Sequence, residues 1–382
     1  MASQVPKLLT STSFTACGAP KWLTYCWRLL LLLVLLPHVA FSGQIVKYLP
    51  GFDGELPFKL ETGYVSVGDS ELFYYFIESQ GPLEFDINHY KGGLPKLKYY
   101  PYAWTKWLLE HPQYLLVQLF IGGDSYSGIT VPLITQKVVE ANEAMVYPYL
   151  NLKGYLLGSP TTDQLLNANA KIIFAHRMAL ISDQLYEKLK TSCNDSYVDV
   201  DPSNTACVAA LGTYEMCIKD LYTNDILEPS CVFASHRENS ETVRRSAKEN
   251  PKNFILSPPR IPELWCRNFN YVLAYVWSNN LEVQDALHAR KGAVSTWQRC
   301  NQTLSYTKDV QSVIDVHRYL SNKGLEVLVQ NGDRDMVVPF VATQTWIKSL
   351  NLTISDEWRP CLLMAKLQAN SEQLSHEFFW LV

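Results

Sequence analysis

Hydrophobic and polar positions follow patterns along this chain that predict both strands and helices. Two alternating runs, Gly63–Gly68 and Leu72–Ser79, flank a short turn and predict an antiparallel strand pair. An apolar strand that ends in Gly122-Gly123 is followed by Ile129–Met145, whose apolar residues recur with the 3.6-residue period of a packed helix. Another strand is expected over Leu150–Leu157. This strand–helix–strand order predicts the βαβ unit of a parallel sheet.

The middle of the chain differs in character from the segments on either side. From Thr161 to Cys300, helical stretches such as Leu165–Leu189 alternate with polar loops that carry cysteines. We interpret this region as a helical insertion that is stapled by disulfides. The sheet resumes with the apolar run Leu325–Gln330, and Phe340–Leu350 predicts another helix. The pattern as a whole is that of an α/β fold with a helical insertion.

The strongest candidate for chemistry is Ser125, within Gly122-Gly123-Asp124-Ser125-Tyr126-Ser127-Gly128. A strand enters this segment and a helix leaves it, which is the layout of a nucleophile elbow, a sharp turn that lifts a serine hydroxyl above the sheet. The N–H of Tyr126 would then donate to an oxyanion. Because Ser127 stands where the strict motif has its second glycine, we interpret the segment as a variant. An ordinary turn of small residues is the alternative.

A serine nucleophile needs a base, and the base needs an acid that orients it. Asp335 follows the predicted strand Leu325–Gln330 at the edge where parallel strands end, and Asp333 competes with it. The spacing favours neither. After Asp335 the sequence contains one histidine, His376, with no glycine-rich loop before it. We interpret His376 as a residue of an irregular tail rather than as the base.

Two further features argue against a complete site. His176, His288 and His317 fall in helical patterns, where structural roles are the expectation. Between Ser79 and the nucleophile strand there are about 40 residues, too few for an oxyanion loop, another strand and the connecting helices. We therefore expect the second oxyanion donor, which such a loop supplies, to be missing.

The first 42 residues have the pattern of a secretory signal peptide. Lys21 and Arg28 precede the short apolar run Leu29–Leu36, and Ala40-Phe41-Ser42 supplies small residues for cleavage after Ser42. The run is too short to span a membrane comfortably, although a retained anchor is the alternative. A net charge of −4 and a pI near 6.1 give no reason to expect nucleic-acid binding.

Entry into the secretory pathway changes the interpretation of the cysteines. Of nine cysteines, two lie in the signal peptide, and most of the other seven should pair in an oxidising compartment. Candidate glycosylation sites are Asn194, Asn301 and Asn351. These features favour a secreted or vacuolar glycoprotein. No pattern in the sequence indicates a cofactor or a metal site.

Six short segments together are more specific than any single motif. They are Tyr48-Leu49-Pro50-Gly51-Phe52, Gly63-Tyr64-Val65, Gly122–Gly128, Asp199-Val200-Asp201-Pro202, Val283–His288 and Gly332–Pro339. With them the chain resembles plant serine carboxypeptidase-like proteins, whose fold is an α/β-hydrolase with a helical insertion. The resemblance implies that Ser125 is the nucleophile and that Asp335, not Asp333, is the triad acid.

The departures from the family are as informative as the matches. The family's Gly-Gly-Pro-Gly-Cys oxyanion loop should lie near Gln80-Gly81, a further strand and helix near Thr105-Lys106, and a Gly-Gly-His loop after Arg359-Pro360, but none is found. The chain therefore resembles an internally deleted variant with an altered tail, from skipped exons or a flawed gene model. The resemblance implies the disulfides Cys193–Cys207 and Cys231–Cys266, and it leaves Cys300 without the loop cysteine.

On this basis the chain divides into five parts: a signal peptide (1–42), the first part of the hydrolase core (43–160), a helical cap insertion (161–305), the second part of the core (306–360) and a divergent tail (361–382).

The resemblance also suggests the reaction. Family peptidases carry Glu before the nucleophile, where it helps to hold a peptide's terminal carboxylate, whereas this chain has Asp124, as in members that resemble acyltransferases using glucose esters. The implied substrates are a peptide C-terminus, or an acyl-glucose ester with a hydroxyl acceptor, and Asp124 slightly favours acyl transfer. For this chain we expect weak activity or none. The alternative is a non-catalytic secreted glycoprotein that binds a ligand or partner.

Overall fold

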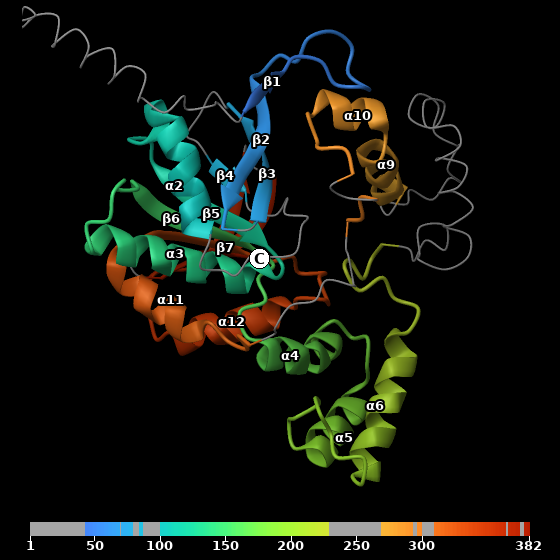
Figure 1. Cartoon of the computed structure of the whole chain (residues 1–382). Helices are drawn as coiled ribbons and strands as arrows, with labels where there is room; N and C mark the ends of the chain where they lie inside the picture. The colour runs from blue at the N-terminus through green and yellow to red at the C-terminus, as the bar shows by residue number, and fades with distance from the viewer. Residues whose placement is uncertain are drawn as a thin grey trace, which may run out of the picture. The chain divides into compact units, whose positions relative to one another are not determined.

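The protein has a mixed α/β architecture (Figure 1) in a computed structural model that describes residues 43–68, 70–78, 84–86, 100–228, 269–292, 296–299, 309–363, 366–374 and 378–382. The strands are β1 (Gln44–Val46), β2 (Leu60–Val67), β3 (Ser70–Ile77), β4 (Glu84–Asp86), β5 (Leu119–Asp124), β6 (Leu152–Gly158), β7 (Glu326–Gln330), β8 (Ile354–Leu363), β9 (Lys366–Leu374) and β10 (Phe378–Leu381). The α-helices are α2 (Tyr100–Glu110), α3 (Ser127–Glu143), α4 (Gln164–Arg177), α5 (Asp183–Cys193), α6 (Thr205–Ile218), α9 (Phe269–Ser278), α10 (Leu281–Ala286), α11 (Ile314–Leu320) and α12 (Phe340–Ser349), with 3₁₀ turns η2 (Pro112–Tyr114) and η4 (Ser321–Lys323).

The strands form two sheets. The larger has the order β4-β5-β6-β7-β10-β9-β8, and the first five of these strands run parallel to one another. The smaller sheet is antiparallel, with the order β1-β2-β3, and β2 and β3 confirm the strand pair predicted from the alternating pattern. Since parallel strands end at the same edge, the loops after β5, β6 and β7 are neighbours.

One face of the central strands is fully buried and the other is half-buried, which explains their nearly continuous apolar character. Ile121 of β5, Tyr155 of β6 and Val329 of β7 are inaccessible to solvent. Helix α3 packs against β5 and β6. This βαβ unit is the one that the sequence predicted, and it fixes the position of the turn between β5 and α3.

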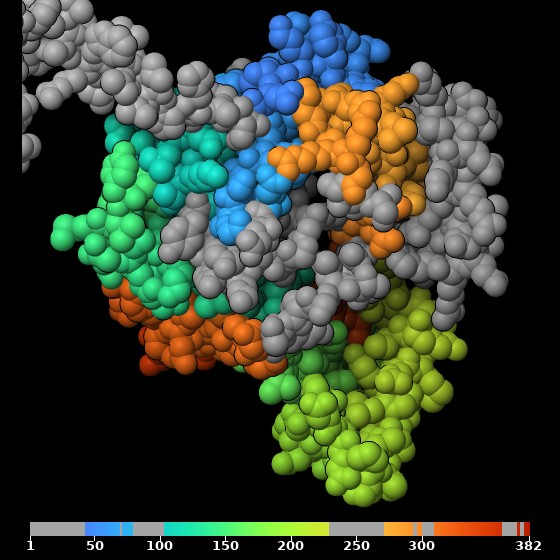
Figure 2. Space-filling model, in the orientation of Figure 1, coloured from blue at the N-terminus to red at the C-terminus, as the bar shows by residue number. Residues whose placement is uncertain are grey.

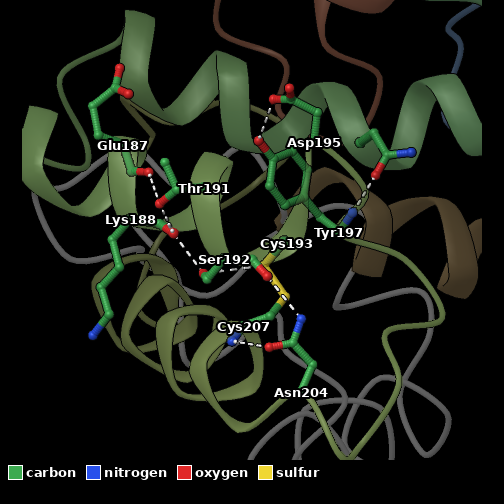
Figure 3. Close-up of a disulfide and its surroundings, with 10 residues drawn as sticks. Glu187, Lys188, Thr191, Ser192, Cys193, Asp195, Tyr197, Asn204 and Cys207 are labelled. Carbon is green, nitrogen blue, oxygen red and sulfur yellow. Dashed lines mark hydrogen bonds between the residues drawn. A yellow bond between two sulfur atoms is a disulfide. The ribbon is translucent and has the colours of Figure 1, made fainter.

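Helices α4, α5 and α6 form a second hydrophobic cluster, which includes Phe174, Leu189 and Ala210. The disulfide Cys193–Cys207 joins the end of α5 to the first turn of α6, as the family resemblance implied (Figure 3). The insertion is therefore helical and disulfide-stapled, as expected.

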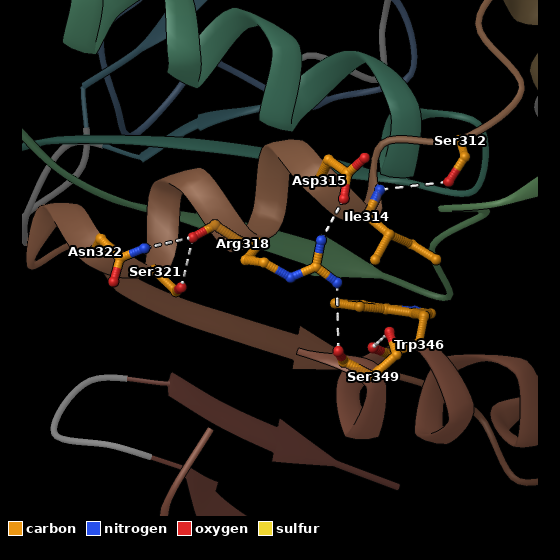
Figure 4. A network of polar contacts seen from close by, with 8 residues as sticks. All are labelled: Ser312, Ile314, Asp315, Arg318, Ser321, Asn322, Trp346 and Ser349. Atoms are coloured by element: carbon orange, nitrogen blue, oxygen red, sulfur yellow. Dashed lines mark hydrogen bonds and ion pairs between the residues drawn. The ribbon is translucent and has the colours of Figure 1, made fainter. Parts of the chain in front are cut away.

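A polar network supports the helices that flank β7 and β10 (Figure 4). Arg318 of α11 pairs with Asp315 one turn earlier and donates to the backbone carbonyl of Ser349, at the end of α12, at 3.3 Å. The guanidinium therefore links the two helices.

The C-terminal segment corrects one expectation. We expected an irregular tail, but β8, β9 and β10 are strands, and β10 lies beside β7 with Phe378 and Trp380 buried. Their burial explains the pairing, because two large apolar side chains on alternate positions face the core. One three-residue strand, β4, lies in the interval that the sequence indicated is too short for an oxyanion loop, another strand and the connecting helices together.

The opposite edge of the parallel strands carries an apolar loop between α3 and β6. Met145 is 90% exposed and Tyr147 is 77% exposed. This green loop reaches the left side of the surface in Figure 2. Among the described residues, no helix has the length and apolar character needed to cross a membrane.

Candidate active site

Ser125 occupies a sharp turn between β5 and α3, and its side chain is exposed. Its φ angle of 57° lies in the left-handed region, which costs free energy for a residue with a side chain. A nucleophile elbow holds its serine in such a strained conformation. Because turns at Met145 and Ala179 also hold non-glycine residues at positive φ, the role of Ser125 as nucleophile stays a prediction.

The glycines around Ser125 are required by close packing. A Cβ atom on Gly123 would lie 2.5 Å from the Cβ of Ser127. A Cβ atom on Gly128 would lie 2.7 Å from the backbone N and O of Thr161. Only a glycine at position 128 lets the start of α3 lie this close to Thr161. Gly128 thus takes the place of the motif's second glycine, and a serine can stand at position 127.

Main-chain hydrogen bonds tie together the three loops at the carboxyl edge of the sheet. The Ser125 N–H donates to the Gly158 carbonyl at 2.9 Å, and the Ser125 carbonyl accepts from Thr161 N–H at 2.9 Å. Ser159 N–H donates to the Gln330 carbonyl at 2.6 Å. The ends of β5, β6 and β7 are therefore held in one register.

Asp335 lies in the loop after β7, half-buried and held by main-chain donors. Its Oδ1 accepts from Val337 N–H at 2.8 Å and from Val338 N–H at 3.0 Å, and the nearby Ser159 side chain also favours the ionised carboxyl. Burial raises the pKa of Asp335, while these hydrogen bonds work in the opposite direction. A fixed and partly desolvated carboxylate is suited to orienting a base.

Asp333 differs from Asp335 in every one of these respects. Its side chain is 71% exposed, and the ion pair that it forms is with Arg334 at 4.0 Å. Arg334 also pairs with Asp225 at 3.2 Å. Asp335 is therefore the more buried and more firmly held of the two carboxyl groups, and its role as the acid stays a prediction.

Ser159 also lies at this edge of the sheet, although no sequence motif pointed to it. Its φ of 38° lies in the left-handed region, as does that of Ser125, and its side chain helps to lower the pKa of the Asp335 carboxyl. The signal was present, because Gly158-Ser159-Pro160 ends a predicted strand at the same edge.

Asp124 and Tyr126 flank the candidate nucleophile. Asp124 is the exposed last residue of β5, and a Cβ on Gly158 would lie 3.3 Å from its Cβ. Tyr126 occupies the N-cap position of α3. Their roles, in substrate binding and in oxyanion stabilisation through the Tyr126 N–H, stay predictions.

The described histidines have structural surroundings. His317 is fully buried with Nδ1 2.7 Å from the Tyr155 hydroxyl, and burial lowers its pKa to about 3. His176 bonds to Asp183 at 2.7 Å. His288 Nδ1 lies 3.3 Å from Thr62 Oγ1. None of these contacts involves Ser125 or Asp335.

Several predicted features lie outside the described residues: His376, Cys231, Cys266, Cys300, Asn301 and Gln80-Gly81. Strand β10, which begins at Phe378, runs parallel to β7, so its first residue lies at the edge opposite to Asp335. Asn194 and Asn351 are exposed, as glycosylation requires.

Within the described ranges, no cluster of His, Cys, Asp or Glu could hold a metal ion.

Three comparisons relate this chain to known proteins. The sequence profile of serine carboxypeptidases matches residues 100–377. Serine carboxypeptidase-like 16 from Arabidopsis thaliana is 34% identical over 416 residues, covering 90% of this chain and 89% of the relative. Serine carboxypeptidase-like 11, from the same organism, is 34% identical over 422 residues, with 91% of each covered. Because both alignments are longer than the 382 residues here, the relatives contain segments without a counterpart in this chain.

Among solved structures, the prohormone-processing carboxypeptidase Kex1(Δ)p from Saccharomyces cerevisiae has a TM-score of 0.54 to this chain at 14% identity, with 75% of this chain and 61% of that chain covered. This likeness shows the fold, which is that of the α/β-hydrolases with a helical insertion. The profile match and the two plant relatives show more: the chain belongs to the serine carboxypeptidase family.

Proposed function

We propose that this protein is a serine acyl-transfer scaffold in which Ser125 is the nucleophile and Asp335 the acid of the triad. The observation that carries the proposal is the strained, exposed Ser125 at the end of β5, tied through the loop after β6 to the loop that holds Asp335. Family membership supports the same reaction class.

The reaction forms and breaks one bond in each half. The Ser125 oxygen bonds to the carbonyl carbon of an amide or ester, and the leaving group departs with a proton. The acyl-serine ester is then attacked by water, or by the hydroxyl of a second substrate, which restores the serine proton. Hydrolysis and transfer thus share one intermediate and differ in the acceptor.

Asp124 is the residue that favours one class of substrate over the other. A carboxyl group one methylene shorter than Glu extends less far toward the terminal carboxylate of a peptide. We therefore propose an acyl-glucose ester as donor and a hydroxyl compound as acceptor, with a peptide C-terminus as the second candidate. No cofactor is required for either.

The activity of this chain is proposed to be low. No described histidine lies in the loops that carry Ser125, Ser159 and Asp335, and the family's oxyanion loop is absent from the sequence. Removal of a single oxyanion donor lowers kcat by about 100- to 1000-fold. The predicted signal peptide, together with exposed sequons at Asn194 and Asn351, supports a secreted or vacuolar glycoprotein.

Labelling with a fluorophosphonate probe tests the proposal, since the probe reacts with an activated serine hydroxyl. We expect slow, time-dependent labelling of the secreted protein at Ser125, which Ser125→Ala abolishes and Ser66→Ala, on the exposed surface of β2, leaves unchanged. Rapid stoichiometric labelling would show that a base acts in this chain. Complete absence of labelling in folded protein over a day would instead favour a non-catalytic binding protein.

A further inference from the structure

A buried carboxylate in the smaller sheet has no role in the proposed chemistry. Glu61 lies on β2 with its side chain 5% exposed. Its Oε1 accepts from the Tyr74 hydroxyl at 2.8 Å and lies 2.8 Å from His111 Nε2. Among the described residues, no hydrogen bond reaches Oε2. A buried carboxylate with one unused oxygen can accept a further donor.

The protons of this cluster can be counted from its partners. His111 Nδ1 lies 2.8 Å from the Trp107 carbonyl, which only accepts, so Nδ1 carries a proton. The contact between Nε2 and Glu61 Oε1 then holds one more proton, on either atom. Within the described part of the chain, Oε2 is therefore the oxygen of this cluster that remains free to accept a hydrogen bond.

The backbone of Gly43 lies directly against this carboxylate. Strand β1 pairs with β2 so that Ile45 is opposite Glu61, which makes Gly43 the diagonal neighbour of Glu61 on the same face. A Cβ atom on Gly43 would lie 2.1 Å from Glu61 Oε1 and 2.5 Å from the Tyr74 hydroxyl oxygen. A residue with a side chain does not fit there unless the carboxylate moves.

Gly43 is also the first residue of the mature chain if the signal peptide is cleaved after Ser42, as the sequence predicts. Cleavage would convert its amide nitrogen into an ammonium group with three donors. An ammonium group and a carboxylate form charge-assisted hydrogen bonds, which are about twice as strong as hydrogen bonds between neutral groups. We propose that Glu61 binds the α-ammonium group of Gly43, so that processing of the leader completes a buried ion pair. This inference is independent of the serine chemistry.

The test uses the full chain expressed with its own leader in a secretory host. Intact mass and the N-terminal peptide give the first residue, which we expect to be Gly43. The purified protein is then treated with a limiting N-hydroxysuccinimide ester at pH 7. A free α-amino group has a pKa of about 7.7–8.0 against about 10.4 for lysine, so it normally reacts much faster.

In the folded protein we expect Gly43 to react no faster than Lys47, whose side chain is 68% exposed. Denaturation should raise the relative rate at Gly43 at least tenfold. Glu61→Gln should raise it similarly in folded protein, whereas Glu78→Gln, a half-exposed glutamate just after β3, should not. If Glu61→Gln does not fold, the relative labelling rate of Gly43 in folded and in denatured wild-type protein still tests the proposal. A mature chain that begins elsewhere, or equal labelling of Gly43 before and after denaturation, would overturn the proposal.

Discussion

The hydroxyl group of Tyr155 on β6 lies 2.7 Å from Nδ1 of His317 on α11, and both side chains are inaccessible to solvent. Trp346 of α12 stacks on the imidazole with ring centroids 4.6 Å apart. Nε2 of His317 has no hydrogen-bond partner among the described residues. This histidine is therefore neutral in the native protein, and it joins the sheet to two helices.

The buried histidine should make the protein sensitive to acid. Burial lowers the pKa of His317 from 6.5 to about 3. Below pH 6.5 the unfolded chain binds more protons than the native state, so stability falls as the pH falls from 6.5 toward 3 and is unaffected above that range. The loss should be about 1.4 kcal/mol per pH unit within the window.

Urea unfolding at pH 7 and pH 5 measures this effect. His317→Gln keeps a hydrogen-bonding group for Tyr155 but removes the titration, so its stability should change about 2 kcal/mol less between the two pH values. The control is His176→Gln, at a partly exposed position beside Asp183. Equal pH dependence in wild type and His317→Gln would contradict the assignment.

Gly128→Ala should disturb the elbow. Its Cβ would lie 2.7 Å from the backbone of Thr161, which cannot move without breaking the bond to Ser125. We expect destabilisation of about 1–3 kcal/mol and slower labelling of Ser125. Gly212→Ala in α6 is the matched control, because its Cβ would meet nothing within 4 Å. That control should be neutral or stabilising by up to about 1 kcal/mol.

Ser159→Ala should raise the pKa of Asp335 further. Burial already raises it, and the Ser159 side chain is one of the groups that oppose the rise. A raised pKa means that the native state binds the proton of Asp335 more tightly than the unfolded chain does. The contribution of this proton to the free energy of unfolding is therefore lost as the pH rises through the native pKa. Carboxyl ¹³C chemical shifts recorded against pH would report the change, with Asp333 as the internal reference. An unchanged titration of Asp335 would show that Ser159 does not interact with it.

Loss of the disulfide should destabilise the α5–α6 hairpin. The bridge closes a loop of 14 residues in sequence separation, and a loop of this size contributes about 3 kcal/mol. Replacing both Cys193 and Cys207 by alanine should lower the urea midpoint by the corresponding amount. Cys217→Ser is the control, since Cys217 is exposed and unpaired among the described residues. A midpoint like that of the control would show that the bridge adds little to the packing of Leu189 and Ala210.

The elements predicted correctly are those whose burial leaves a strong periodic pattern. Strands β5, β6 and β7 are apolar on both faces, and helix α3 has one face against them, so each was evident from the sequence. Strand β10 has only four residues, and its assignment depends on pairing with β7 rather than on its own pattern. Tertiary pairing of this kind has no local signal.

In the candidate site, too, some features have a local sequence signal and others depend on contacts between distant residues. The turn around Ser125 is encoded locally by small residues, whereas the choice between Asp335 and Asp333 depends on main-chain donors and on Ser159, more than 170 residues away in the sequence. The contact of Glu61 with His111 spans 50 positions, and neither residue belongs to a motif. Long-range partners of this kind become visible only in the fold.

The ends of β5, β6 and β7, beside Ser125, Ser159 and Asp335, are bound to one another through peptide groups. An exchange of the Ser125 side chain would therefore leave these main-chain bonds in place. Such a frame allows a lineage to lose its chemistry by substitution while its architecture persists, so that inactive and active members can share one shape and later diverge in purpose.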